Sequence, residues 1–165
     1  MPLVLDEDVF RSVVGDDTLE ADEIQTVLRA AYVTAEIDLD EDIAERHALE
    51  DLSTALWRFA DHAPEPIEVV SPIPLDDEER LWFIAQLATR LTRRPARELA
   101  YVVSYLLTAS DLELAPIESR FLDQLQRALG IADESAADLV ATAAEVATPG
   151  VSRSLDLSSR EHRGA

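Results

Sequence analysis

Residues 99–107 read Leu-Ala-Tyr-Val-Val-Ser-Tyr-Leu-Leu, a run that would be apolar nearly all round a helix. A helix with so little polar surface has to be covered on every side, because exposed apolar area is unfavourable in water. Pro95 precedes the run and suits the first turn of a helix, where its missing N–H costs no hydrogen bond. We therefore expect this segment to form the central helix of the protein.

Apolar residues recur at helical spacing on both sides of this run. The spacing predicts helices with buried faces at Ile24 to Ala35, Leu49 to Phe59, Leu81 to Leu91 and Ile117 to Leu129, and an alanine-rich helix over 133–146. Strand signals are almost absent, and only residues 67–70 show one. The predicted fold class is all-α, a single compact bundle of about seven helices.

Local signals place several helix ends. Asp42 reads as the N-cap of a capping box, so a helix should begin near Ile43. Asp76 and the three acidic residues after it predict another start, because carboxylates favour the positive end of a helix dipole. Pro116 predicts a third start, and Gly130 predicts the C-cap of the helix between them.

The chain contains a weak internal repeat. An apolar helical run leads into Asp38, and Glu45 stands seven residues later; Asp111 and Glu118 have the same spacing and setting. The repeat predicts a pseudo-two-fold bundle with halves at about residues 20–62 and 76–147, joined by a proline-rich linker at 63–75. Residues 1–147 then form one domain, and residues 148–165, which lack apolar periodicity, should be a disordered tail.

The charge of the chain restricts its partners. It has 34 acidic and 14 basic residues, a formal net charge of −20, and no cysteine. Nucleic acids and anionic membranes need basic side chains to neutralise phosphates, so we expect neither as a direct ligand. The N-terminus lacks a secretory signal and no apolar run is long enough for a membrane span, which favours a cytoplasmic location. A protein partner with a basic surface is expected.

The stretch Ser104-Tyr105-Leu106-Leu107-Thr108-Ala109-Ser110-Asp111-Leu112-Glu113, followed by Glu118 and a helix closing at Leu129-Gly130, resembles the second half of TerB-like domains of the bacterial tellurite-resistance family. Residues 30–45 resemble the first such turn of that family. The resemblance implies an all-helical scaffold and a bacterial stress or defence context. Leu39 and Leu112 stand where the family usually has Gly, and Leu is unfavourable at positive φ, so the turns should differ in shape.

The two acidic turns are the candidate metal sites. Hard divalent cations such as Ca²⁺ or Mg²⁺ prefer carboxylate oxygens, and the resemblance suggests two sites made by Asp38, Asp40, Glu45, Asp111, Glu113 and Glu118. The structural interpretation is simpler, and we favour it: Glu45 and Glu118 fall near the third position of their helices, where a carboxylate can accept unpaired backbone N–H groups. An EF-hand does not fit, because its glycine and final glutamate positions hold Ile43 and Leu49.

A second candidate site is the cluster of basic residues Arg90, Arg93, Arg94 and Arg97. It could contact an anion or an acidic partner, or it could instead compensate helix ends and carboxylates of the protein itself, which we favour.

Four aromatic residues flank the linker at helical spacing, and we expect them to form the core between the two halves: Trp57, Phe59, Trp82 and Phe83.

No catalytic pattern is present in the sequence. The chain has four glycines and shows no phosphate loop, nucleophile elbow or paired Ser and His motif. The sequence therefore predicts a non-catalytic acidic interaction module without a required cofactor. Two alternatives remain open: a Ca²⁺- or Mg²⁺-binding protein that uses the acidic turns, and an acidic mimic of nucleic acid that binds a basic protein.

Overall fold

The computed structural model describes residues 5–37, 43–67, 73–74, 76–109 and 116–147. These residues form α-helices and no strand, which confirms the predicted all-α fold. The helices of this described part are α1 (Glu7–Val14), α2 (Ala21–Glu36), α3 (Ile43–Phe59), α4 (Asp77–Arg90), α5 (Arg94–Ala109), α6 (Pro116–Ala128) and α7 (Asp133–Val146). Among the described residues, none of the helices has both the length and the apolar character that crossing a bilayer requires.

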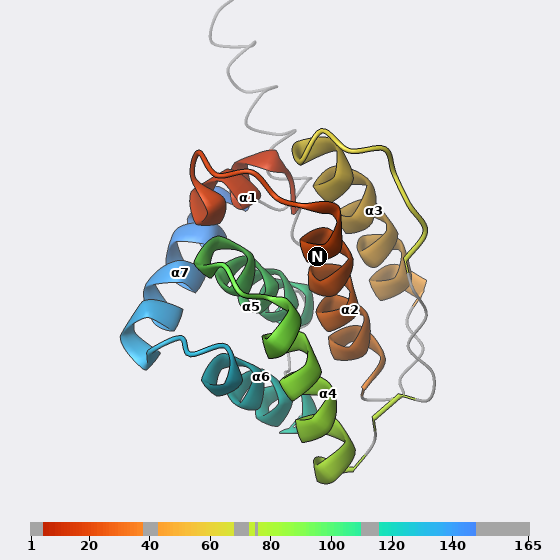
Figure 1. Cartoon of the computed structure of the whole chain (residues 1–165), viewed down its shortest axis with the longest axis vertical. Coiled ribbons are helices and arrows are strands. Elements are labelled where there is room, and N and C mark those ends of the chain that lie inside the picture. Colours follow the sequence, from red (N-terminus) through yellow and green to blue (C-terminus); the bar gives the residue numbers. More distant parts are fainter. Residues whose placement is uncertain (1–4, 38–42, 68–72, 75, 110–115, 148–165) are drawn as a thin grey trace, which may run out of the picture.

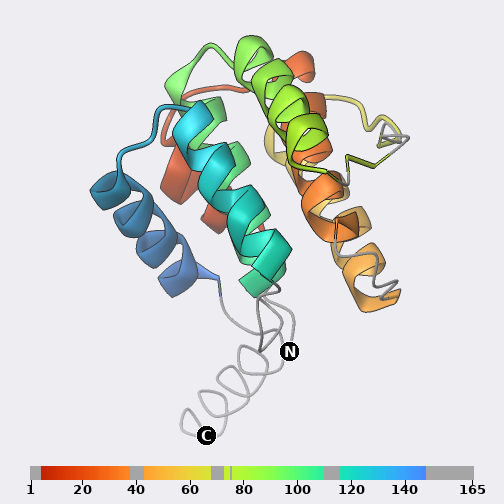
Figure 2. The same ribbon diagram turned by 90° about the horizontal axis from the view of Figure 1, so that it is seen from below.

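Helix α5 lies at the centre of the bundle, as its apolar sequence predicts (Figure 1). It packs against α1, α2, α3, α6 and α7. Leu99 and Tyr101 are both buried although they lie two residues apart and point to nearly opposite sides of the helix axis. Figure 2 shows α6 on one side of this helix and α2 and α3 on another. Different helices cover α5 on several sides, so little of its surface meets water and few of its residues need to be polar.

Helix α1 is an element that our prediction from the sequence did not include. It has eight residues, and its buried Val9 and Phe10 belong to the main core. The Asp6 carboxylate begins the helix by accepting the backbone N–H of Asp8 at 3.1 Å. The Phe10 ring meets the Phe59 ring edge-on, with centroids 5.5 Å apart. Val9, Phe10, Val13 and Val14 recur at helical spacing, so the sequence does carry a signal for this helix. Two turns are not stable alone, and the helix therefore depends on tertiary packing.

Several helix ends agree with the sequence signals. Helix α3 begins at Ile43 and α6 begins at Pro116. Asp76 is the N-cap of α4, and its carboxylate accepts the Glu79 backbone N–H at 2.7 Å. Gly130 follows α6 with a φ of 71°, and the Ile131 N–H donates to the Gln126 carbonyl at 3.1 Å, which is the Schellman arrangement.

The predicted aromatic core is wrong for Trp82. Trp57 is fully buried and Phe59 packs on the core, but 67% of the Trp82 surface is exposed. Leu81, which we placed on the buried face of α4, is 52% exposed. The inward stripe of α4 contains Ile84 and Leu87. Trp82 stands two residues before Ile84, about 200° away around the helix, and therefore points to solvent.

Other predictions fall partly or wholly outside the described residues. Residues 63–67 and 73–74 of the predicted linker are not helical. The signal for a strand at 67–70, the tail 148–165 and both repeat turns include undescribed positions. The pseudo-two-fold repeat therefore stays a prediction.

The ends of α3 and α6 generate a paired prediction about stability. Asp61 holds a φ of 57° after α3, in the same hydrogen-bonding arrangement that Gly130 makes after α6. Asp61→Gly should stabilise the protein by about 0.5–1 kcal/mol because glycine has no Cβ to clash at positive φ, and Gly130→Ala should destabilise it by about 1 kcal/mol. Urea denaturation of both variants measures the two changes. Equal changes in stability from both substitutions would contradict the assignment of positive φ to Asp61 and Gly130.

Candidate functional site

The acidic turns are only partly visible in the structure. Asp38, Asp40, Asp111 and Glu113 lie outside the described residues, and for Glu45 only the backbone of α3 is described. Glu45 and Glu118 are each the third residue of a helix, the position expected from the sequence. The Glu118 side chain is buried, with 4% of its surface exposed. No group of three or more potential metal ligands gathers among the described residues, so the cation sites stay a prediction.

The four arginines of the basic cluster do not form one surface patch. Arg93 makes a two-pronged contact with the buried Glu23 of α2, with its Nε 3.0 Å from Oε2 and a second guanidinium nitrogen on Oε1. Arg94 pairs with Glu98 one turn along α5, at 2.8 Å. Arg90 is exposed, and its side chain makes no hydrogen bond or ion pair within the described part of the chain. Arg93 and Arg94 are therefore compensated by carboxylates of the protein.

Glu23 is the buried member of this ion pair. Burial acts to raise the pKa of its carboxyl, but the hydrogen bonds from Arg93 and from the Glu20 backbone N–H outweigh it and hold the pKa below its ordinary value. The same contact raises the pKa of the Arg93 guanidinium. Arg93 also donates to the Thr18 carbonyl. The pair therefore fixes the loop before α5 against the start of α2.

Arg97 serves the ends of two helices at once. Its guanidinium donates to the carbonyls of Ala88 at 2.9 Å and Leu91, at the end of α4, and to the Leu129 carbonyl at 3.0 Å, after α6. The last carbonyls of a helix have no partner within the helix and carry partial negative charge. The planar fork of arginine can reach several of them together. Arg97 is thus a structural residue that joins α4, α5 and α6.

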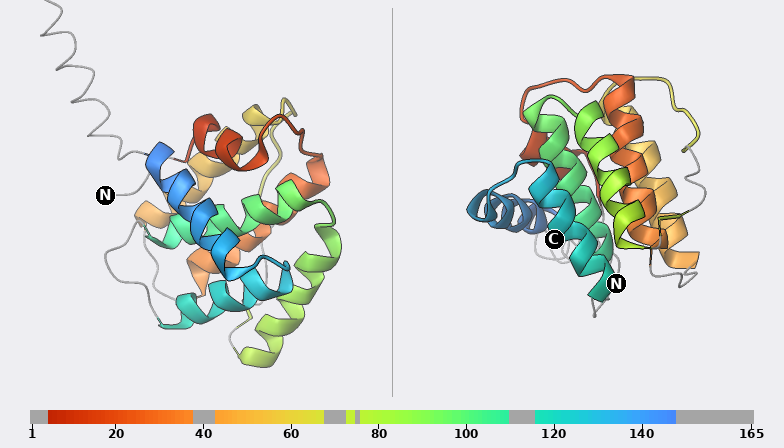
Figure 3. Two further views of the ribbon diagram at one scale, coloured as in Figure 1. Left: turned by 90° about the vertical axis from the view of Figure 1, so that its left-hand side faces the viewer. Right: turned by 60° about the horizontal axis from the view of Figure 1, so that its bottom comes forward.

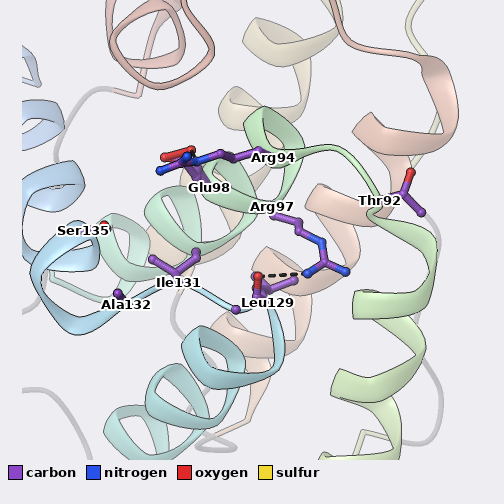
Figure 4. Close-up of a pocket in the computed structure, with 9 residues that line it drawn as sticks. Thr92, Arg94, Arg97, Glu98, Leu129, Ile131, Ala132 and Ser135 are labelled. Carbon is purple, nitrogen blue, oxygen red and sulfur yellow. Dashed lines mark hydrogen bonds and ion pairs between the residues drawn. The ribbon is translucent and has the colours of Figure 1, made fainter.

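A hollow of about 450 Å³ lies beside Arg97, between the starts of α5 and α7 (Figure 4). The side chains around it include Thr92, Arg94, Arg97, Glu98 and Ser135. Figure 4 shows Arg94 turned toward Glu98 and Arg97 bound to the Leu129 carbonyl. Both guanidinium groups are thus already engaged, and the Glu98 carboxylate would repel an anion. The hollow is poorly suited to strong anion binding.

A second hollow, of about 420 Å³, lies between α5, α6 and α7. Tyr101 and Tyr105 line it together with Gln126, Asp133 and Val140. Burial raises the pKa of the Tyr101 hydroxyl. The side-chain amide nitrogen of Gln126 donates to the Asp133 carboxylate at 2.7 Å. These contacts join α6 to α7 and supply no nucleophile with an adjacent base.

The most distinctive exposed feature is one side of α4, here called the α4 outer face and made of Glu78, Leu81, Trp82, Ala85 and Thr89. Leu81 and Trp82 are the large hydrophobic residues that are exposed among the described residues. Together they form a small apolar area on this side of the helix. The spacing of Ile84, Leu87 and Leu91 could have shown that Trp82 points away from the core, but its apolar character favoured burial.

Acidic residues surround the beginning of this face. Asp76, Asp77, Glu78 and Glu79 are all exposed. The hydrogen bond from Arg80 lowers the pKa of the Asp77 carboxyl, and Arg120 adds an ion pair at 3.7 Å. The Glu78 side chain makes no hydrogen bond or ion pair within the described residues. The α4 outer face thus combines an apolar centre with a negatively charged end.

No family model matches the chain, and no curated protein or solved structure matches it either. The interpretation of its surfaces therefore depends on the residues themselves.

The Arg93–Glu23 pair predicts a pH-dependent loss of stability. Because the pKa of Glu23 is lower in the folded protein than in the unfolded chain, its stabilisation is present at neutral pH and is lost as the pH falls through that pKa. Glu23→Gln should cost about 1–2 kcal/mol at pH 7, since Arg93 is partly exposed, and the difference from wild type should shrink in acid. Urea denaturation at several pH values measures it. Glu98→Gln is the control and should change stability by less than about 0.5 kcal/mol, because the side chain of its partner Arg94 is 80% exposed.

Arg97 gives a second prediction about stability. Arg97→Lys keeps the positive charge but removes the planar guanidinium group with its several N–H donors. Some of the carbonyls of Ala88, Leu91 and Leu129 therefore lose their hydrogen-bond donor. We expect a loss of about 1–3 kcal/mol in the free energy of unfolding. Arg94→Lys, at an exposed position, is the matched control. If both variants unfold at the same denaturant concentration, Arg97 does not join the helices as described.

Proposed function

We propose that the protein is a non-catalytic acidic helical module that binds a basic protein. The single observation that supports this most strongly is that exposed carboxylates outnumber exposed arginines among the described residues. Arg80 is buried, Arg93 is paired with Glu23, and Arg97 is engaged by backbone carbonyls. Exposed carboxylates are distributed over α1, α2, α4 and α7. A surface of this kind attracts positively charged partners and repels phosphate-rich ones.

The proposed context is a bacterial stress or defence response of the tellurite-resistance type. It is supported by the resemblance of residues 104–131 to TerB-like domains. Binding of Ca²⁺ or Mg²⁺ at the acidic turns would be compatible with the same role, because a bound cation could bridge the turn to a partner. A cytoplasmic setting is part of the proposal.

Capture from a bacterial cell extract on the immobilised full-length chain tests this function. We expect basic proteins to be retained at low salt and released as the salt concentration rises toward about 0.5 M, because screening weakens interactions between exposed charges. A parallel column with chelator reveals whether a divalent cation takes part. Retention of acidic proteins only, retention that does not respond to salt, or no retention above the bare matrix would contradict the proposal.

A further inference from the structure

Helix α4 lies at the outside of the bundle, where one of its sides is not covered by another described helix (Figure 3). It packs against α2 and α6 through its other side, which carries Ile84 and Leu87. Glu78, Trp82, Ala85 and Thr89 follow one another at intervals of three or four residues on the opposite side, and Leu81 flanks them. This stripe covers three turns, about 16 Å of helix.

We propose that the α4 outer face is the docking site for a basic amphipathic helix. The inference rests on the proposed function and names the surface and the partner chemistry. A partner helix of similar length can lie along α4 with apolar residues on Leu81, Trp82 and Ala85. Its lysine or arginine side chains then meet the carboxylates at the start of α4, which gives charge complementarity as well as apolar contact.

Trp82 is the natural anchor of this interface. Tryptophan offers a large flat apolar surface with little conformational freedom to lose, and it is enriched among residues that dominate binding. Two-thirds of its surface is available in the free protein. Glu78 stands one turn before Trp82 and has no described partner, so its carboxylate is available to a basic side chain of the ligand.

A second copy of the chain fits this face less well. Two chains with a net charge of −20 each repel one another. Arg90, at the far end of α4, offers one positive charge against the four carboxylates from Asp76 to Glu79. The apolar centre consists of one large aromatic, which can bury about 150–250 Å², and two smaller residues, whereas a stable dimer needs about 800 Å² per partner.

The test uses two labelled 18-residue peptides made of lysine and leucine. In one peptide the leucines form a single helical face, and in the other the same residues are scrambled. Fluorescence anisotropy with the full-length protein measures both dissociation constants. We expect tighter binding of the amphipathic peptide, and at least about ten-fold weaker binding of that peptide by Trp82→Ala. Trp82 is exposed, so an unchanged melting temperature confirms that this variant folds.

Charge variants separate the contribution of α4 from the general acidity of the chain. Glu78 and Glu134 are both exposed and both occupy the second position of a helix, α4 and α7 respectively. Glu78→Gln should weaken binding of the amphipathic peptide about two- to five-fold at low salt, and Glu134→Gln should leave it unchanged.

The remaining outcomes distinguish the two proposals. If wild type binds both peptides equally and Trp82→Ala has no effect, this docking site is wrong while the binding of basic partners stands. If wild type binds neither peptide at low salt, the proposed function fails as well. A dimer that forms without peptide and disappears in Trp82→Ala, measured by sedimentation, would make a second copy the occupant and would overturn the inference.

Discussion

The covering of α5 on all sides is the constraint on which the rest of the structure depends. Its apolar residues point in all directions, so no single layer of helices can bury them. Five helices from both ends of the chain pack around it. The short α1 takes part through Val9 and Phe10, which would have little reason to be helical without this surface. The bundle is thus organised by one hydrophobic axis.

Polar contacts at the start of α5 fix the relative positions of the helices, which apolar packing alone does not determine. Burial of α5 fixes which helices are neighbours, but it leaves them free to slide, because the hydrophobic effect has no direction. Arg93 and Arg97 provide directional contacts, since each joins its own segment to other helices with fixed donor geometry. The basic cluster that resembles an anion site in the sequence thereby acts mainly within the fold.

The sequence predicted the helices better than it predicted their exposed faces. The helical spacing and the residues Asp76, Pro116 and Gly130 determined α2 to α7 because these signals are local. Helix α1 was not predicted, although Val9, Phe10, Val13 and Val14 stand at helical spacing between Asp6 and Gly15. Trp82 was assigned to the core because of its apolar character, whereas the direction in which it points depends on where α4 meets α2 and α6. The partners of Arg93 and Arg97 are far away in sequence, so spacing alone could not identify them.

Trp82 points to solvent, whereas Arg93 and Arg97 bind groups of the protein itself. These two features have a common consequence for recognition. Charge alone attracts any basic molecule and distinguishes poorly among them. An apolar anchor beside the carboxylates adds a requirement for a matching apolar face, because only such a partner removes Trp82 from water while its basic groups stay paired. Selectivity in an acidic protein therefore comes from the small apolar part of its surface. In this fold that part lies on α4, the helix whose C-terminal end is held to α5 by Arg97.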